Sequence, residues 1–174
     1  MILPISKLPA KVLRNPVEDL KFPLAKDQAR LIKNMLDTCI SANGVGLAAP
    51  QISKSLNMAL IYLEEAGVPP FVIINPKILK VSKDTDEVEE GCLSLPGVFG
   101  MIKRPKKITM EAYDISGEKF TITDDTFLAR VLQHEIDHLN NILIADKFEK
   151  ITTGESLLPN YGLSATASKA GAKK

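Results

Sequence analysis

The chain contains two histidines, His134 and His138, which enclose Glu135 in the stretch QHEIDHLNNI. On an ideal α-helix, with about 100° of turn per residue, His138 lies about 40° from His134 and therefore on the same face. Phe127 and Val131 fall on that face too, at about 20° and 60°. Apolar residues fill the adjoining arc, so the two histidines and the glutamate are predicted to point into the buried side of a core helix. The remaining, polar arc holds Arg130, Gln133, Asp137 and Asn140.

A buried Glu135 needs a partner or a chemical purpose, because an unpaired carboxylate inside a protein costs several kcal/mol. Metal ligation explains all three polar residues at once, since histidines four apart can direct ring nitrogens to one ion. The His-Glu-x-x-His pattern is best known from zinc proteases, in which the glutamate handles protons. Two structural histidines with an ion-paired glutamate are the alternative that the residues alone leave open.

A metal site of this kind requires a third ligand, and the chain has no other histidine. Glu149 and Glu155 follow the helix, but Glu155 lies in Thr-Thr-Gly-Glu-Ser, which is a poor helix former. Upstream, Cys92 stands in EEGCLSLPG, within a loop bounded by glycine and proline. A thiolate with two imidazoles is a strong ligand set, and it leaves one tetrahedral position open, which indicates catalysis rather than structure.

Length and charge limit the possible classes of protein. The 174 residues are enough for one domain with its own core, and a net charge of +1 gives no general attraction to DNA or a lipid surface. The basic stretch 103–107 and the basic tail are interpreted as solvated surface. Two cysteines are too few for a disulfide scaffold, and no signal peptide or membrane-spanning run is found. A cytoplasmic location is therefore expected.

Periodicity predicts the remaining elements. A helix of about 20 residues is expected between Pro23 and Gly44, with Cys39 on its buried stripe. Strands are predicted at 58–63 and 71–75, and alternation over 107–123 predicts a hairpin that turns at Ser116-Gly117. The histidine-bearing helix is expected to begin near Asp124 and Asp125, as N-cap residues. This order of helix, strands and helix indicates an α+β fold without internal repeats.

Three blocks of the sequence resemble the peptide deformylase family, whose members remove the N-formyl group from new polypeptides. They are GVGLAAPQ at 44–51, EGCLS at 90–94 and QHEIDH at 133–138, in the order found in the family. The resemblance runs from about Leu13 to Asp146 and is closest to the shorter bacterial type. It implies antiparallel sheets packed around a central metal-binding helix, with an N-terminal helix. Residues 1–150 would form a single catalytic domain, and 151–174 a C-terminal extension whose last dozen residues are flexible.

The resemblance also implies a role for each residue of the catalytic centre. Cys92, His134 and His138 would hold one divalent metal per chain, natively Fe²⁺, with Zn²⁺, Ni²⁺ or Co²⁺ also accepted. Glu135 would take a proton from water and later give one to the departing amine. Gln51, through its side-chain amide, and Leu93, through its backbone N–H, would donate hydrogen bonds to the oxyanion.

Six further residues match substrate-binding positions of the family. Val45 and Gly46 would pair with the peptide backbone, while Phe127 and Val131 would line an apolar slot for the methionine side chain. Glu90 and Arg104 match positions near the substrate groove, although an ion pair that shapes the loop is the alternative. The implied partners are N-formyl-Met nascent peptides and the ribosome near its exit tunnel, with no DNA and no membrane.

Two rival functions remain open from the sequence. One is a zinc endopeptidase that uses His134, His138 and Glu155 and does not need Cys92. The other is a metal-stabilised binding module that retains the fold but releases no formate. One departure from the family is mild: Asn140-Asn141 replaces the usual glycine after the helix, and asparagine is the second-best residue for a left-handed cap.

Overall fold

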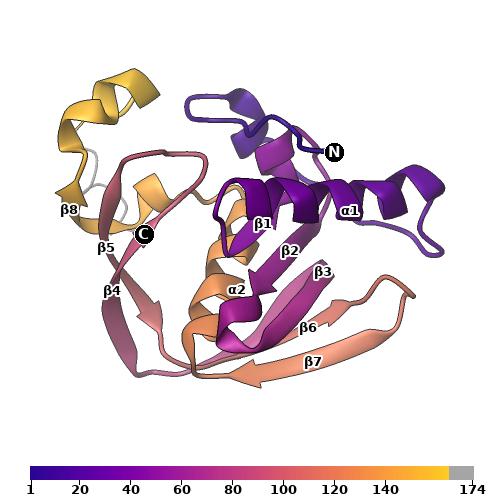
Figure 1. Cartoon of the computed structure of the whole chain (residues 1–174). Helices are drawn as coiled ribbons and strands as arrows, with labels where there is room; N and C mark the ends of the chain where they lie inside the picture. Colours follow the sequence, from indigo (N-terminus) through magenta and orange to yellow (C-terminus); the bar gives the residue numbers. More distant parts are fainter. Residues whose placement is uncertain (165–174) are drawn as a thin grey trace.

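The computed structural model of this chain describes residues 1–164, and in it two antiparallel sheets lie on either side of one buried helix, α2 (Figure 1). The larger sheet has the order β1-β2-β3-β6-β7, and the smaller has the order β4-β5-β8. Chain segments far apart in sequence therefore meet at α2. This architecture confirms the predicted α+β class and the antiparallel sheets around a central helix.

The helices and strands have the following bounds. The α-helices are α1 (Lys26–Ser41) and α2 (Phe127–Leu139). The larger sheet contains β1 (Gly46–Ala48), β2 (Met58–Leu63), β3 (Val68–Val81), β6 (Ile108–Tyr113) and β7 (Lys119–Asp124). The smaller sheet contains β4 (Thr85–Gly91), β5 (Phe99–Pro105) and β8 (Phe148–Thr153). Short 3₁₀ helices are η1 (Lys11–Arg14), η2 (Ala49–Ile52), η3 (Glu64–Ala66), η4 (Ile144–Asp146) and η5 (Glu155–Tyr161).

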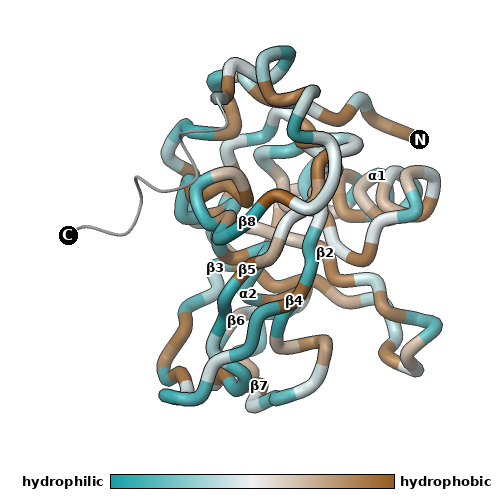
Figure 2. The backbone as a smooth tube through the Cα atoms, turned by 90° about the vertical axis from the view of Figure 1, so that its left-hand side faces the viewer, coloured by the Kyte–Doolittle hydropathy of each residue, from teal (hydrophilic) through white to brown (hydrophobic). Residues whose placement is uncertain are grey.

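Helix α1 covers one end of the larger sheet and is shorter than predicted, with 16 residues instead of about 20. It begins at Lys26, where the Gln28 side chain accepts a hydrogen bond from the Ala25 N–H at 3.0 Å. Hydrophobic and hydrophilic residues alternate around its turns (Figure 2), as expected for a helix with one buried stripe. Cys39 is fully buried on that stripe, so its prediction as a core residue is confirmed.

The predicted hairpin is confirmed in β6 and β7. Met110 pairs with Ile122 and Ala112 with Phe120, which places their side chains on the face toward the core. Gly117 has a φ of +85°, a left-handed conformation that favours glycine, and it lies in the predicted turn. Alternating apolar residues therefore set the register of this part of the sheet.

Helix α2 differs from its prediction at the start and on its polar arc. Its N-cap is Thr126, not Asp124 or Asp125, although the Asp124 carboxylate accepts hydrogen bonds from the N–H groups of Thr126 and Ala129 at 2.8 and 3.0 Å. Arg130 and Gln133, assigned to the polar arc, are 7% and 6% exposed. The helix is buried on this side as well because the smaller sheet packs there and supplies hydrogen-bond partners.

The smaller sheet and the segment after it were not predicted. β4 has the sequence TDEVEEG, whose single hydrophobic residue gives no strand periodicity. β8 crosses residue 150, so the expected domain boundary at that point falls inside a strand that pairs with β5. Leu158 in η5 is 2% exposed and packs in the same core cluster as Phe148. The expected flexible tail lies, from residue 165 onward, outside the described residues.

No helix within residues 1–164 has both the length and the apolar character needed to cross a membrane.

Candidate active site

Three side chains from two distant segments converge at the middle of α2. Cys92 directly follows β4, and His134 and His138 stand one turn apart on α2. Their ligand atoms all lie within 4.8 Å of one another, and Cys92 Sγ is 3.2 Å from His138 Nε2. The structure thus brings together the three residues that the sequence nominates as metal ligands.

This cluster has the chemistry of a transition-metal site. One sulfur and two imidazole nitrogens suit Fe²⁺, Zn²⁺, Co²⁺ or Ni²⁺ better than Mg²⁺ or Ca²⁺, which prefer oxygen. Within residues 1–164 no other group of three or more His, Cys, Asp or Glu side chains has this geometry. Glu149 and Glu155 are exposed and stand outside the cluster, so the endopeptidase ligand set is not assembled.

The electrostatics of the cluster favour the thiolate, which is the form that binds metal. Burial alone would raise the pKa of the Cys92 thiol, but the charge of His138 and hydrogen bonds with both histidines lower it well below its ordinary value. Burial alone would lower the pKa of His134, but hydrogen bonds with Cys92 and Glu90 raise it to about 10. The protein therefore stabilises a negative sulfur beside the two rings.

Glu135 lines the same cavity as Cys92 and His134, but it is not part of the ligand cluster. It is 3% exposed, and its Oε2 has no hydrogen-bond partner among the described residues. Burial raises the pKa of its carboxyl group to about 6, and the positive charge of the two histidines limits the rise. A buried carboxylate oxygen without a partner is costly in a purely structural role, and it is well suited to exchange a proton with a bound molecule.

Gly46 gives Glu135 the space it occupies. An ideal Cβ on Gly46 would lie 2.4 Å from Oε1 of Glu135 and 2.9 Å from its Cγ. Any other residue at this position of β1 would therefore displace the carboxylate. The family resemblance implied that Gly46 pairs with a peptide backbone, but the sequence did not indicate that this glycine also makes room for a side chain of α2.

The amide of Gln51 is oriented by hydrogen bonds at both of its ends. The N–H of Ala48 donates to Gln51 Oε1 at 2.8 Å, so Nε2 points the other way, toward Ser94 Oγ at 3.2 Å and Cys92 Sγ at 3.6 Å. Gln51 is 2% exposed and lies in η2, immediately after β1. Its N–H donors therefore face the cluster. Ser94 was missed by the sequence analysis, although it lies within the EGCLS block.

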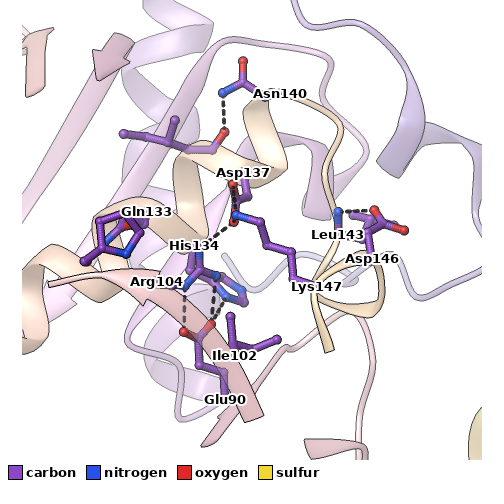
Figure 3. Close-up of polar contacts among 12 residues, drawn as sticks. Glu90, Ile102, Arg104, Gln133, His134, Asp137, Asn140, Leu143, Asp146 and Lys147 are labelled. Atoms are coloured by element: carbon purple, nitrogen blue, oxygen red, sulfur yellow. Dashed lines mark hydrogen bonds and ion pairs between the residues drawn. The ribbon is translucent and has the colours of Figure 1, made fainter. Parts of the chain in front are cut away.

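A chain of ion pairs orients the His134 ring through its Nδ1 atom (Figure 3). Glu90 Oε2 lies 3.1 Å from His134 Nδ1, and the Glu90 carboxylate also accepts two hydrogen bonds from Arg104 at 2.7 and 2.9 Å. Arg104 donates in turn to Asp137 at 2.7 Å, and Lys147 donates to Asp137 at 2.8 and 2.9 Å. Burial alone would raise the pKa of Glu90, but these hydrogen bonds hold it far below its usual range.

Arg104 was expected to lie on a solvated basic surface and near the substrate groove, and the structure changes both interpretations. The residue is 1% exposed, so it does not belong to the solvated basic surface expected for residues 103–107. It does not line the cavity at the site either, whereas Glu90 does. Glu90 and Arg104 were expected either to lie near the substrate groove or to form an ion pair with each other, and in the structure they form the ion pair. Asp137, which was placed on the polar arc of the helix, takes part in the same chain of ion pairs.

A cavity of about 450 Å³ opens beside the cluster. Val45, Gly46, Phe127 and Val131, all predicted to contact substrate, line it together with Glu135. Val131 is buried, whereas Phe127, predicted to lie on the same helix face, is 53% exposed at the start of α2. The arrangement places the apolar side chains of Phe127 and Val131 at a cavity that the Cys92 and His134 side chains and the buried Glu135 carboxylate also line.

Comparison with known proteins gives a consistent result. Residues 2–153 match the family "Polypeptide deformylase". The peptide deformylase of Chlorobium luteolum is 42% identical over 154 residues, which cover 86% of this chain and 80% of that protein. That of Desulfitobacterium hafniense is 43% identical over 150 residues, which cover 86% of this chain and 96% of that protein.

Solved structures agree with these relatives. The peptide deformylase of Synechococcus elongatus, in complex with actinonin, superimposes with a TM-score of 0.83 at 35% identity, over 96% of this chain and 90% of that one. The enzyme of Thermotoga maritima gives a TM-score of 0.80 at 34% identity, over 86% of this chain and 99% of that one. The chain belongs to the polypeptide deformylase family.

Proposed function

We propose that this chain removes the N-formyl group from the formyl-methionine at the start of new polypeptides, releasing formate, with Glu135 as its catalytic base. The observation that carries the assignment of roles is the position of Glu135. Its carboxylate is buried and borders the cavity beside the Cys92, His134 and His138 cluster, and one of its oxygens has no hydrogen-bond partner within residues 1–164.

The three ligand residues would hold one divalent metal ion. Such an ion would act as a Lewis acid and lower the pKa of a water molecule bound to it toward about 7. The family resemblance implies Fe²⁺ as the native metal, with Zn²⁺, Ni²⁺ or Co²⁺ as replacements, and a thiolate with two imidazoles suits all four ions. Glu90 supports His134 in this role, since its hydrogen bond to Nδ1 leaves Nε2 as the nitrogen for a metal.

Proton transfer is the task of Glu135. Hydrolysis of the formamide consumes one water molecule: its oxygen bonds to the formyl carbon, and the C–N bond then breaks. Glu135 accepts a proton from the attacking water and returns one to the departing amine nitrogen, so the products are formate and a free N-terminus. With a pKa near 6, the carboxyl group is mainly ionised at neutral pH and can still act as an acid afterwards.

Charge on the formyl oxygen would be met by fixed donors. The Nε2 group of Gln51 faces the cluster, and the backbone N–H of Leu93 directly follows Cys92 in the chain. Donors held in place before the reaction stabilise a developing oxyanion without reorganisation, and removing one typically costs about 3 kcal/mol.

The walls of the cavity suit the rest of the substrate. β1 is an edge strand of the larger sheet, so the chain at Val45 and Gly46 can offer backbone groups to an extended peptide. Phe127 and Val131 would form the apolar side of a slot for the methionine side chain. Such a substrate places the enzyme in the cytoplasm, close to the ribosomal exit tunnel where formylated chains emerge.

The test is formate release from N-formyl-Met-Ala-Ser by protein purified without oxygen and supplied with iron. Wild type should release formate, whereas Glu135→Ala should not, with its metal content unchanged. Glu149→Ala, an exposed glutamate outside the site, serves as the control and should match wild type. A metal-loaded wild type that releases no formate would instead support a binding module.

A further inference from the structure

We propose that residues 6–8 form a clasp that sets the separation of the two groups that donate to the oxyanion, the side-chain amide of Gln51 and the backbone N–H of Leu93. This inference rests on the proposed function. The clasp contributes no residue to the ligand cluster or to the wall of the cavity. Ser6 and Leu8 are therefore positioning residues, which act through the segments that they hold.

The clasp binds both donor segments, η2 and residues 92–95, through its backbone. The N–H of Ser6 donates to the carbonyl oxygen of Gln51 at 2.7 Å, and the N–H of Leu8 donates to the carbonyl oxygen of Ser94 at 2.9 Å. Ser94 directly follows the donor residue of its segment. Two residues of chain span at most about 7 Å, so these two bonds limit how far the donor segments can separate.

The clasp is anchored at each end to the segment whose carbonyl group it binds. Leu8 is 9% exposed and packs in the same core cluster as Leu95. At the other end, the hydroxyl oxygens of Ser6 and Ser53 lie 2.8 Å apart, and Ser53 directly follows η2. The clasp therefore connects the two donor segments and does not merely cover them.

The direct hydrogen bonds between the donor segments depend on the group that has to act on the substrate. Within residues 1–164 there are two such bonds, from Gln51 Nε2 to Ser94 Oγ at 3.2 Å and to Cys92 Sγ at 3.6 Å. Nε2 has two hydrogens, and the oxyanion takes one of them, so at most one direct bond persists during the reaction. The bonds of the clasp use backbone groups that take no part in the chemistry, and they hold the segments together at that stage.

The separation matters because both donors must reach the same oxygen atom. A donor stabilises an oxyanion well at about 2.7–3.1 Å, and the interaction weakens steeply as its angle departs from linearity. A catalytic group misplaced by about 1 Å can cost on the order of 100-fold in rate. Because the oxyanion develops only after substrate has bound, loss of the clasp should lower kcat and leave KM nearly unchanged.

The experiment replaces single backbone amides of the clasp by esters, which removes an N–H donor and leaves every side chain unchanged. Residues 1–38 are made by chemical synthesis and joined to the rest of the chain at Cys39, which gives the full chain without an added residue. Esters at Ser6, at Leu8 and at both are compared with the all-amide chain. An ester at Lys7 is the control, because Lys7 is exposed and its N–H donates to neither segment. Metal content, kcat and KM for N-formyl-Met-Ala-Ser are measured for each chain.

We expect an ester at Ser6 or at Leu8 to lower kcat per bound metal ion by about tenfold or more, with KM within about twofold of the all-amide value. The double ester should lose little more than either single ester, because a clasp that is open at one end no longer connects the segments. The Lys7 ester should match the all-amide chain.

Three results would overturn the inference. Esters at Ser6 and Leu8 that match the Lys7 control would show that the clasp does not affect the donors. Losses that multiply in the double ester would show that each bond holds its own segment separately. A loss of metal with an unchanged kcat per bound metal ion would show that the clasp serves the ligands. If the Leu8 ester does not fold, the Ser6 ester, at the less buried end, decides among these outcomes.

Failure of the proposed function is a separate result. An all-amide chain that carries metal but releases no formate would contradict the proposed function itself, whatever the ester chains do.

Discussion

Oε2 of Glu90 lies 3.1 Å from Nδ1 of His134, and the same carboxylate accepts two hydrogen bonds from the buried Arg104. One acidic side chain thus orients the imidazole ring and joins it to a cation that water cannot reach. Groups of this kind usually contribute to metal affinity as well as to stability. The position of the ring depends on β4 and β5 as much as on α2.

Replacing Glu90 by glutamine should therefore weaken metal binding by about 10- to 100-fold, because a neutral amide holds the ring less firmly. The variant should also unfold more easily, since two buried guanidinium groups lose part of their counter-charge. Competition with a chromophoric chelator measures the affinity. Glu89→Gln is the matched control, because Glu89 is exposed on the same strand and should behave like wild type. Equal affinities in the two variants would contradict the role of Glu90.

Replacing Gln51 by leucine should reduce kcat by a factor on the order of 10² to 10³, with a smaller change in KM. The side chain keeps its approximate size but loses the Nε2 donor that faces the cluster. Steady-state kinetics with N-formyl-Met-Ala-Ser, on protein of verified metal content, gives both constants. Ser94→Ala removes only the neighbouring acceptor, so its loss of kcat should be much smaller. A larger loss in Ser94→Ala would argue against Gln51 as the donor.

The two cysteines should differ sharply in their reaction with iodoacetamide. Burial, with the nearby charge of Glu135, raises the pKa of Cys39 to about 12, and its side chain is fully buried. Cys92 has a lowered pKa and lines the cavity. At pH 8, metal-free protein should be alkylated at Cys92 alone, and bound metal should protect it. Peptide mass spectrometry locates the label, and alkylation of Cys39 before unfolding would contradict this prediction.

The elements predicted best from the sequence are those that pack directly on the core. β2 is a run of six residues, MALIYL, and both its bounds are as predicted. β6 and β7 alternate between apolar and polar residues, which set their register. Such patterns arise because each of these strands buries one face against α2, and β2 buries its other face against α1, so a local signal is enough.

The sequence could not predict what depends on partners from distant segments. Arg104 and Arg130 are charged and look like surface residues, yet both are buried because Glu90 and Asp86 come from β4 to meet them. β4 itself has one hydrophobic residue, and it forms a strand because β5 supplies its backbone partners along its whole length. Paired burial of opposite charges leaves no periodic trace in a single sequence.

The ion pair between Arg14 and Asp146 should add acid-sensitive stability. Burial alone would raise the pKa of Asp146, but the hydrogen bond from Arg14 holds it below its ordinary value of 3.8. A carboxylate with a lowered folded-state pKa stabilises the protein above its unfolded-state pKa. This contribution is lost as the pH falls through the lower, folded-state value.

Urea unfolding of wild type and Asp146→Asn at a series of pH values tests this linkage. The difference in unfolding free energy should be constant above about pH 5 and shrink as the pH falls below about 4. Its size should be modest, because both side chains are more than a third exposed to solvent. A difference that stays constant down to the lowest accessible pH would show that the carboxylate charge contributes nothing.

Gly46→Ala should inactivate the enzyme while leaving its metal site intact. The added Cβ would lie 2.4 Å from Oε1 of Glu135, a distance that requires the carboxylate to move. Because Glu135 does not belong to the ligand cluster, the metal should still bind, but the base would be misplaced relative to the water that it must deprotonate. Misplacement of a catalytic group by about 1 Å can cost on the order of 100-fold in rate.

Two measurements separate this effect from a general loss of structure. Metal content and thermal stability report on the fold, whereas kcat reports on Glu135. Val45→Ala changes the adjacent residue, whose side chain is 44% exposed, so it should lower kcat far less. If Gly46→Ala instead loses metal while its kcat per bound metal ion is unchanged, the close contact between β1 and α2 supports the ligands rather than the base. The role assigned to Glu135 would then need other evidence.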